Sequence, residues 1–494
     1  MKRNIVILTI CIMICFLPIT SASMMNPISD VYPSKSIPQT EQTYDWPDGS
    51  FTGEWTQGDS QGHMTGHLNQ GRRPTIGRMY GEWNTTNSDE QGRIEGIFRG
   101  PLVFGKKIAD TTSVFFGFIN FDDKNFNGIF LSKQGILRCS GIHQESYLPS
   151  FTGLYDVGVL SIHMIDENRL EEFTADDPDD FREIMVQLWY PVDKDTPNQR
   201  IDYMDEITFE WLMGRSPIPL IQIPKTAYKF VRPYSKTAPP ISQENDMFPI
   251  IIFSHGYDGV FQIYTSLIED LTSHGFIVAS INHPYVAGVT VFPDGRSVYL
   301  SPDPPGEYAI RTIVEDAKFV LDELTIMNET DPFFSGHLDL SKVGMYGHSF
   351  GGANTAICCY EDERFLAGLT LDGVIREEYI PEGIDQPFCI MLADGRFNSS
   401  SIDLIWNLLN DDAYKVGIIG STHYGYTDVG LLLGHLVPLI PPNLLGFGSI
   451  EPKRMVNITK SFEIAFFEVY LKDMDREHIL DLSSVFNEVE FGYK

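Results

Sequence analysis

Positive charge is scarce in this chain of 494 residues, in which 36 lysines and arginines stand against 67 aspartates and glutamates. The net charge is −31, and removal of Lys2 and Arg3 with a leader peptide changes it from −31 to −33. A surface this acidic repels nucleic acid and anionic membranes, because both carry negative charge. The composition therefore argues against a nucleic-acid-binding protein, and most of the carboxylates are expected on a solvated surface.

Apolar runs long enough to cross a bilayer are also lacking. The run from Ile5 to Ile19 is shorter than the roughly 20 residues that a membrane span needs, and Val429 to Phe447 is interrupted by a histidine and three prolines. The first run lies between two basic residues and the small residues Ser21-Ala22-Ser23, which is the order of a secretory signal peptide. We therefore expect residues 1–23 to be removed and the mature protein to be secreted and extracellular.

Cysteine is rare, with six in the chain, and two of them, Cys11 and Cys15, belong to the expected signal peptide. The other four show no metal-ligand spacing. Cys358 and Cys359 are expected to pack inside a helix, and a disulfide through Cys139 or Cys389 is compatible with export.

Glycine and aromatic residues dominate the region from 45 to 142, after a linker rich in proline, serine and threonine at 24–44. Short units such as Gly49-Ser50-Phe51-Thr52-Gly53-Glu54-Trp55 and Gly77-Arg78-Met79-Tyr80-Gly81-Glu82-Trp83 put bulky residues on one face of a strand, with glycines at the turns. We expect a small all-β domain of β-hairpin repeats, which stack to bury a shared face. Repeat modules of this kind usually mediate surface or protein attachment, and this one carries no catalytic motif. Its resemblance to hairpin repeats of the MORN type is loose.

Residues 143–494 show a different pattern, in which short apolar strands alternate with helices. The strands are expected at 248–254, 276–282, 343–346, 366–371, 388–392 and 414–419, and the helices at 260–273, 307–327, 350–360, 401–409 and 455–471. Fully apolar strands separated by helices predict an α/β domain with a mostly parallel central sheet covered on both faces. Residues 153–163 and 182–191 are expected to form an antiparallel edge of that sheet, and about 200–247 an insertion or lid.

The sequence Gly347-His348-Ser349-Phe350-Gly351-Gly352 fits the Gly-x-Ser-x-Gly motif at a strand-to-helix junction. The motif needs this context, because the turn is so tight that the neighbours of the serine must be glycines. The turn lifts the hydroxyl above the edge of the sheet, and the N-terminus of the following helix favours negative charge. Ser349 is therefore the predicted nucleophile.

A serine nucleophile needs a base, and in the α/β-hydrolase fold the triad follows the order serine, acid, histidine. Three histidines follow Ser349, namely His423, His435 and His478. Only His423 comes directly after a predicted strand, so its loop lies at the same edge of the sheet as Ser349. We predict His423 as the base.

The acid has two candidates on residue pattern alone. Asp372 ends the strand at 366–371, and Asp394 ends the next strand, at 388–392. Each is able to reach His423, and the commoner position of the acid in this fold slightly favours Asp394.

An oxyanion hole needs two backbone N–H groups, one from the residue after the nucleophile and one from the loop after an earlier strand. The first is Phe350. The loop Ser254-His255-Gly256-Tyr257-Asp258-Gly259 follows an apolar strand. Tyr257 is therefore the second predicted donor.

Six strings in this order resemble the plasma-type platelet-activating factor acetylhydrolase family and its microbial relatives. They are Ile252 to Gly256, Leu271 to Ala279, Gly347 to Gly352, Leu371-Asp372, Gln386-Pro387-Phe388 and Gly420 to His423. The resemblance spans about 153–471 and leaves the glycine-aromatic region outside. It implies that Asp372 is the acid, with Asp394 as the alternative, and that catalysis needs no metal or other cofactor. Asn282-His283-Pro284-Tyr285 departs from the family pattern, so the substrate preference of the family is not carried over.

The predicted function is that of a secreted serine ester hydrolase acting on a small-molecule or lipid ester through an acyl-enzyme. One alternative is hydrolysis of polyesters or other acyl compounds by the same triad, since a fold does not determine a substrate. Another is a catalytically inactive hydrolase scaffold that works as a binding protein. The apolar segment from Leu431 to Gly448 and the insertion from Phe209 to Ile223 are expected to form an acyl pocket with its lid, with burial in the core as the alternative.

Overall fold

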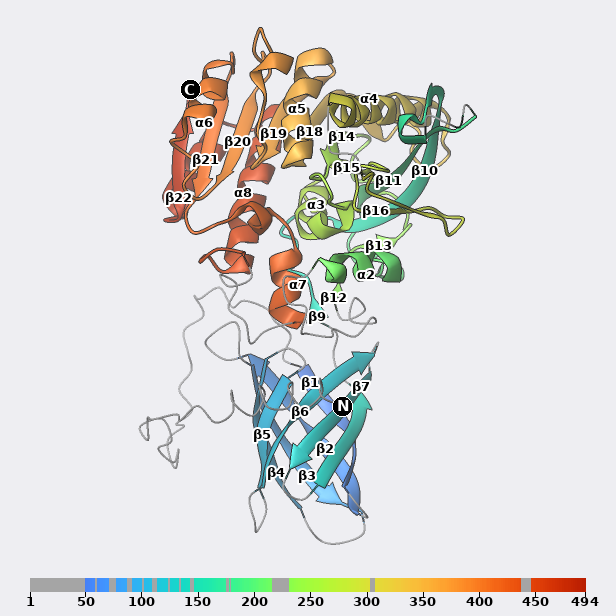
Figure 1. Cartoon of the computed structure of the whole chain (residues 1–494), viewed down its shortest axis with the longest axis vertical. Coiled ribbons are helices and arrows are strands. Elements are labelled where there is room, and N and C mark those ends of the chain that lie inside the picture. Colours follow the sequence, from blue (N-terminus) through green and yellow to red (C-terminus); the bar gives the residue numbers. More distant parts are fainter. Residues whose placement is uncertain are drawn as a thin grey trace. The chain divides into compact units, whose positions relative to one another are not determined.

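The computed structural model (Figure 1) describes residues 49–57, 60–70, 77–86, 91–99, 102–108, 113–122, 125–132, 135–142, 146–174, 177, 179–215, 231–302, 307–436 and 446–494. The expected signal peptide at 1–23 and linker at 24–44 lie outside these residues. No helix in the described part of the chain is both long enough and apolar enough to span a membrane.

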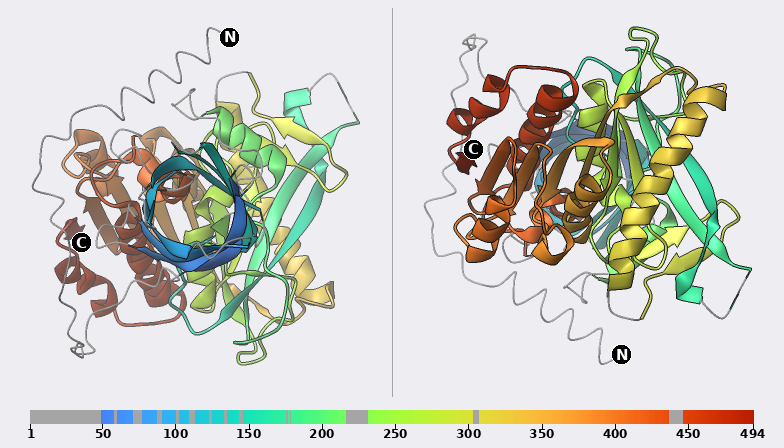
Figure 2. Two further views of the ribbon diagram at one scale, coloured as in Figure 1. Left: turned by 90° about the horizontal axis from the view of Figure 1, so that it is seen from below. Right: turned by 90° about the horizontal axis from the view of Figure 1, so that it is seen from above.

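The first eight strands form one antiparallel sheet that closes on itself. They are β1 (Gly49–Gln57), β2 (Ser60–Gln70), β3 (Gly77–Thr85), β4 (Gln91–Arg99), β5 (Leu102–Ile108), β6 (Ser113–Asp122), β7 (Asn125–Ser132) and β8 (Gly135–Ile142). Each strand pairs with the next, and β8 returns to pair with β1, so that Trp55 stands opposite Cys139. The left view of Figure 2 looks along the ring that results.

The closed ring corrects the expected stack of hairpin repeats. The hairpins are present, but the shared apolar face turns inward. Trp55, Met64, Trp83 and Ile94 are buried, and the rings of Trp55 and Trp83 meet edge to face at 5.6 Å. Closure pairs β1 with β8, so neither strand has a free edge. In an open stack, the outer edges of these two strands would be exposed.

The second part of the chain is built on a ten-stranded sheet with the order β13-β10-β11-β15-β14-β18-β19-β20-β21-β22 (Figure 1). Its strands are β10 (Asp156–Leu170), β11 (Phe181–Val192), β13 (Lys236–Thr237), β14 (Phe248–Ser254), β15 (Ile277–Asn282), β18 (Leu338–His348), β19 (Phe365–Leu371), β20 (Phe388–Ala393), β21 (Ala413–Ile418) and β22 (Val489–Tyr493). The six strands from β15 to β21 run parallel, and β10 and β11 form the expected antiparallel edge. The prediction of a mostly parallel sheet is confirmed. β22, which pairs antiparallel with β21, was not predicted.

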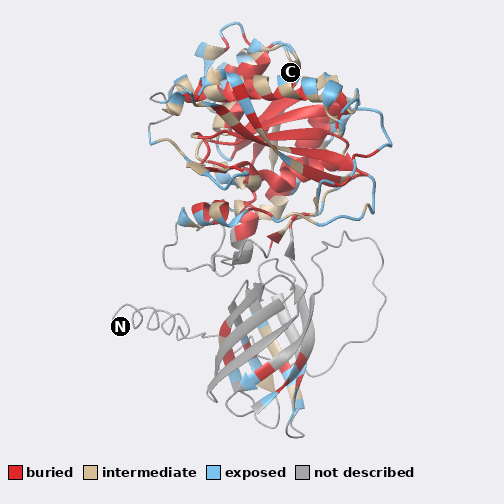
Figure 3. Cartoon of the chain, turned by 90° about the vertical axis from the view of Figure 1, so that its right-hand side faces the viewer, coloured by how far each residue is buried: buried red, intermediate tan, exposed pale blue. Residues whose placement is uncertain are grey.

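Helices cover both faces of this sheet because its strands are apolar on both faces. Along β14, Ile251 and Phe253 belong to one core cluster, whereas Ile250 and Ile252 belong to the other. The first cluster includes residues of α3 (Thr265–Ser273) and α8 (Pro452–Leu471), and the second includes residues of α4 (Glu307–Thr330), α5 (Phe350–Glu361) and α6 (Ser400–Asn407). The central strands β14 and β15 and the strands β20 and β21 are buried along their whole length, and most of the sheet is red in Figure 3.

The expected insertion contains α2 (Glu206–Gly214), β12 (Val231–Arg232) and β13, and β12 pairs with β9 (Ser146–Tyr147). Phe209 is 1 % exposed in the core, while residues 216–230 lie outside the described part. This part of the chain also contains a short hairpin, β16 (Val289–Val291) and β17 (Ser297–Tyr299), and the helices α9 (Glu477–Leu480) and α10 (Leu482–Val485).

The apolar segment from 431 begins inside α7 (Val429–Leu436), where Leu431 and Leu432 are buried in the core. Residues 437–445 lie outside the described part. Leu431 and Leu432 are therefore core residues, as in the alternative expectation, and do not form an exposed acyl-binding surface.

Three cysteines, Cys358, Cys359 and Cys389, are free and buried. The packing expected for the first two is confirmed. Cys389, for which a disulfide was compatible with export, is free and lies inside β20 with its side chain in the core. The side chain of Cys139 lies outside the described part.

Candidate active site

Ser349 stands alone between the end of β18 at His348 and the start of α5 at Phe350. Its φ angle is +54°, which is rare for a residue with a side chain and holds the hydroxyl in a sharp turn. The turn depends on glycine, because a Cβ at Gly351 would lie 2.2 Å from the carbonyl oxygen of Ser254 on β14. The Ser349 N–H donates to the carbonyl oxygen of Leu371, which ties the turn to the end of β19.

His423 begins the short helix η5 (His423–Tyr426) just after β21, at the same edge of the sheet. Its Nε2 lies 2.8 Å from Oγ of Ser349, and its Nδ1 lies 2.6 Å from Oδ2 of Asp372. The three residues predicted as nucleophile, base and acid therefore form one continuous chain of hydrogen bonds. The His423 side chain is 38 % exposed, whereas Asp372 is 2 % exposed.

Asp372 is held as a carboxylate by its neighbours. Burial raises its pKa, but hydrogen bonds from His423 and from the Ala393 N–H, together with the charge of Arg396, outweigh this effect and lower the pKa below its ordinary value. Oδ1 of Asp372 accepts from the Ala393 N–H at 2.9 Å and lies 2.7 Å from Nη1 of Arg396. A carboxylate fixed in this way can orient the imidazole and stabilise its protonated form.

Asp394, the alternative acid, binds the loop in front of His423 instead of the imidazole. Its Oδ2 accepts from the Gly420 N–H at 2.9 Å, and its own N–H donates to Oγ of Ser421 at 3.2 Å. The structure thus brings Asp372, and not Asp394, to the imidazole.

The two predicted oxyanion donors lie next to each other. The rings of Tyr257 and Phe350 meet edge to face at 5.9 Å. A Cβ at Gly256 would lie 3.1 Å from Cβ of Ser349, so the loop after β14 packs directly on the nucleophile. Phe350 is the first residue of α5, so its N–H has no partner within the helix. Within the described part of the chain, no hydrogen bond is found for the N–H of Tyr257 or of Phe350.

His348, the residue before the nucleophile, belongs to the site although the sequence pattern predicted no role for it. Its Nδ1 lies 2.9 Å from the Tyr264 hydroxyl, and its Nε2 lies 2.9 Å from the carbonyl oxygen of His423. Burial, followed by the nearby His423, lowers the pKa of His348 to about 3, so the ring is neutral and can donate from Nε2 while it accepts at Nδ1. The only signal in the sequence is a histidine at the first variable position of the Gly-x-Ser-x-Gly motif.

The insertion reaches the same edge of the sheet. Arg215, at the end of α2, forms an ion pair of 2.5 Å with Asp258, the residue after Tyr257. Asp258 has a φ angle of +58°, so the ion pair joins the insertion to the turn of the loop that carries Tyr257.

No group of three histidine, cysteine, aspartate or glutamate side chains suited to a metal ion occurs among the residues that the structure describes.

A family model described as platelet-activating factor acetylhydrolase, isoform II, matches residues 140–296 and 316–482. The chain is 25 % identical over 330 residues to a platelet-activating factor acetylhydrolase of Cavia porcellus, covering 58 % of this chain and 72 % of that protein. The protein of the same name from Canis lupus familiaris is 24 % identical over 388 residues, covering 69 % of this chain and 82 % of that protein. A probable 1-alkyl-2-acetylglycerophosphocholine esterase of Arthroderma benhamiae is 26 % identical over 271 residues, covering 50 % and 67 %.

Among solved structures, a ferulic acid esterase from Streptomyces cinnamoneus matches with a TM-score of 0.60 and 24 % identity. The match covers 70 % of this chain and 98 % of that protein. The two proteins therefore share a fold.

Proposed function

The chain belongs to the platelet-activating factor acetylhydrolase, isoform II, family of carboxylic ester hydrolases, and on that premise we propose that it cleaves its substrate with a triad of Ser349, His423 and Asp372. One observation carries the proposal, namely the hydrogen-bond chain of 2.8 Å from Ser349 to His423 and 2.6 Å from His423 to Asp372. This hydrogen-bond chain starts at Ser349, which lies in a strained turn between a strand and a helix, the position of the nucleophilic serine in the α/β-hydrolase fold.

In the first half of the reaction, Oγ of Ser349 attacks the ester carbonyl carbon while Nε2 of His423 takes the hydroxyl proton. Asp372 stabilises the imidazolium that results. The N–H groups of Tyr257 and Phe350 bind the negative oxygen of the tetrahedral intermediate. His423 then gives its proton to the departing alkoxide, which leaves as an alcohol, and an acyl-Ser349 ester remains.

In the second half, water takes the place of the alcohol. His423 removes a proton from the water as it attacks the acyl-enzyme, and the second tetrahedral intermediate uses the same two N–H groups. Collapse of this intermediate releases the carboxylic acid, and Ser349 regains its proton from His423.

The proposed substrate class is a small-molecule or lipid ester with a short acyl group. The support comes from the names of the relatives, which are acetylhydrolases and a probable esterase of an acetylated glycerophosphocholine. Hydrolysis of larger acyl esters by the same triad is the second candidate, favoured by the fold shared with a ferulic acid esterase.

The deciding experiment measures hydrolysis and labelling together. The purified full chain and its Ser349→Ala variant are assayed on short-chain and long-chain p-nitrophenyl esters, on an sn-2 acetyl phospholipid, on a feruloyl ester and on a polyester film. Both are also treated with a fluorophosphonate probe. We expect labelling and turnover in the wild type alone, with the highest kcat/KM on acetyl esters. A wild type that neither reacts with the probe nor turns over any ester would mean an inactive scaffold.

We also propose that residues 1–23 are a signal peptide and that the protein acts outside the cell. The support is the basic, apolar and small-residue order of this segment. Protein recovered from the culture medium should begin near residue 24 when its N-terminus is sequenced. An N-terminus at Met1 in that material would contradict the proposal.

A role in attachment is proposed for the closed sheet of β1 to β8. Its support is the exposure of apolar side chains on neighbouring strands, since Ile97 on β4 stands opposite Phe104 on β5 and both are about half exposed. The double variant Ile97→Ser and Phe104→Ser should lose retention on the producing cells without losing esterase activity. Equal retention of variant and wild type would contradict this role.

A further inference from the structure

The Tyr257 N–H belongs to the peptide group that joins it to Gly256, and that peptide group is held in one orientation. The peptide is trans, so its carbonyl and its N–H point in opposite directions. The Gly256 carbonyl oxygen accepts two hydrogen bonds, one from the Gly259 N–H at 2.8 Å and one from Nδ1 of His255 at 2.8 Å. With the carbonyl turned toward these two donors, the Tyr257 N–H must point away from them.

In its neutral form, His255 donates from Nδ1 only if its other ring nitrogen carries no proton. The structure meets this condition, because Nε2 of His255 accepts a hydrogen bond of 3.2 Å from the His283 N–H. The His255 side chain is completely buried, and burial, followed by the neighbouring His283, lowers its pKa to about 3. At neutral pH the ring is therefore an uncharged imidazole with its proton on Nδ1.

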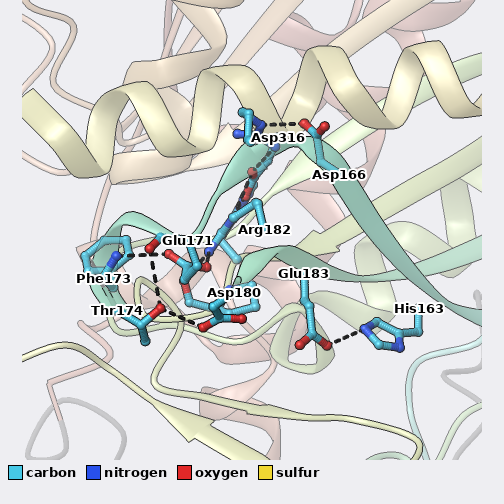
Figure 4. A network of polar contacts seen from close by, with 12 residues as sticks. His163, Asp166, Glu171, Phe173, Thr174, Asp180, Arg182, Glu183 and Asp316 are labelled. Carbon is cyan, nitrogen blue, oxygen red and sulfur yellow. Dashed lines mark hydrogen bonds and ion pairs between the residues drawn. The ribbon is translucent and has the colours of Figure 1, made fainter. Parts of the chain in front are cut away.

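His283 follows β15 and is held by side chains from two other elements, one of which is in turn bound by Arg182. Its Nδ1 lies 2.8 Å from Oδ2 of Asp316 on α4, and its Nε2 lies 3.1 Å from Oγ of Ser254 at the end of β14. Arg182 on β11 binds Asp316 through Nη2 at 2.6 Å, and its Nη1 donates to the Pro284 carbonyl at 3.2 Å and to Glu171 at 2.8 Å. Figure 4 shows Arg182 between Glu171 and Asp316.

Ser254, His283 and Asp316 repeat the residue types and the hydrogen-bond order of a catalytic triad. All three are 0 % exposed, so no substrate reaches the hydroxyl of Ser254. The carboxylate of Asp316 is also neutralised by Arg182. Such a group cannot perform catalysis, but it keeps the backbone of His283 at a constant position, from which its N–H reaches His255.

We propose that His255 is a positioning residue of the oxyanion hole, oriented by the buried group of His283, Ser254, Asp316 and Arg182. It fixes the direction of the Gly256–Tyr257 peptide and thereby aims the Tyr257 N–H at the developing oxyanion. The inference rests on the proposed serine hydrolase function. It gives His255 and His283 a role in that function although they neither touch the substrate nor move a proton.

The test compares two substitutions of His255 in the full chain. Asn carries its amide nitrogen where the imidazole carries Nδ1, so His255→Asn retains the donor to the Gly256 carbonyl, whereas His255→Leu removes it. We measure kcat and KM on p-nitrophenyl acetate, and the Ki of an aliphatic trifluoromethyl ketone that forms a tetrahedral adduct with the serine.

Removal of an oxyanion donor costs about 10²- to 10³-fold in kcat, and a misaimed donor should cost part of that factor. For His255→Leu we expect kcat to fall by at least about tenfold, the Ki of the ketone to rise by a similar factor and KM to stay within about twofold. His255→Asn should recover most of the loss. If His255→Asn is as slow as His255→Leu, or if kcat and Ki do not change together, the positioning role is wrong.

A second pair of variants addresses the same carbonyl without a change to any histidine, so it also serves if His255→Leu does not fold. A Cβ at Gly259 would lie 2.7 Å from the Gly256 carbonyl oxygen, so Gly259→Ala must displace it. A Cβ at Gly214 would meet no atom within 4 Å, so Gly214→Ala is the matched control. We expect the same pattern of kcat, KM and Ki for Gly259→Ala and no change for Gly214→Ala, and an unchanged Gly259→Ala enzyme would overturn the inference.

The fluorophosphonate reaction of the wild type separates the positioning role from the proposed function. If the wild type is labelled at Ser349 while the His255 and Gly259 variants keep full kcat, only the positioning role fails. If the wild type is not labelled and does not turn over esters, the proposed function itself fails.

Discussion

Oδ2 of Asp372 lies 2.6 Å from Nδ1 of His423, although 51 residues separate them in the chain. Asp394, which is closer in sequence, binds Gly420 and Ser421 in the loop that leads to His423. One aspartate therefore contacts the imidazole directly, and the other holds the backbone that carries it.

Replacement of each aspartate by asparagine should separate these two roles. Asp372→Asn should lower kcat by about 10⁴-fold, because an amide stabilises neither the correct tautomer nor the imidazolium. Asp394→Asn should lower kcat by less than about tenfold, because its side-chain oxygen can still accept from the Gly420 N–H. Both variants are assayed on p-nitrophenyl acetate, with melting temperatures as the control for folding. The opposite ranking would assign the acid to Asp394.

The second prediction concerns the hydrogen bond from Nε2 of His348 to the carbonyl oxygen of His423. His348→Phe removes the donor to the His423 carbonyl, and a hydrogen bond of this kind contributes about 0.5–1.5 kcal/mol, or roughly two- to tenfold in kcat if it serves only to position the base. His348→Gln keeps a donor at the place of Nε2 and should lie between His348→Phe and the wild type. Steady-state kinetics of the three proteins at one pH provide the measurement. Equal kcat in all three would show that the His423 backbone needs no such support.

Leu432 tests whether the segment after His423 binds the acyl chain. Its side chain is 1 % exposed and lies in the core. Leu432→Ser should therefore lower the free energy of unfolding by about 2–5 kcal/mol, the cost of a cavity at a buried leucine. The ratio of KM for long-chain to short-chain esters should not change. Leu404→Ser, at a half-exposed position on α6, is the matched control and should melt near the wild type. A selective rise of KM for long-chain esters would return Leu432 to the acyl pocket.

Glu463 on α8 makes the stability of the protein depend on pH. Its side chain is 0 % exposed, and neither carboxyl oxygen has a hydrogen-bond partner among the described residues. Burial, followed by the negative charge of Asp270, raises the pKa of Glu463 well above its ordinary value, which the charge of Lys460 only partly opposes.

Because the pKa of Glu463 is raised in the folded state, its contribution to the stability of the fold is complete below the unfolded pKa of about 4.3. This contribution is lost as the pH rises toward the folded pKa. Glu463→Gln removes this loss. Its stability relative to the wild type should increase by up to about 1.4 kcal/mol per pH unit above pH 4.5. Urea unfolding at pH 4.5, 6 and 7.5 measures the difference, with the exposed Glu329→Gln as control. A difference that does not vary with pH would show that Glu463 is ionised in the native protein.

The residue pattern along the chain was sufficient to predict most of the strands and helices around the site and the residues that carry reactive groups. Continuous apolar runs such as the one at 248–254 predicted strands that the structure confirms almost to the residue. The glycines around Ser349 predicted its turn, because no larger residue fits between β14 and α5. These features are local, so the pattern of side chains along a few residues is sufficient to reveal them.

Features that depend on contacts between distant segments became visible only in the folded chain. Strand periodicity in residues 45–142 is the same for an open stack of hairpins and for a ring, and only the pairing of β8 with β1 distinguishes them. Sheet position alone left two acids in reach of His423, and the orientation of their side chains at the strand ends separates Asp372 from Asp394. The support of the oxyanion loop by His255 and His283 has no motif, because it depends on the direction of one peptide group and on a hydrogen bond between residues 28 positions apart.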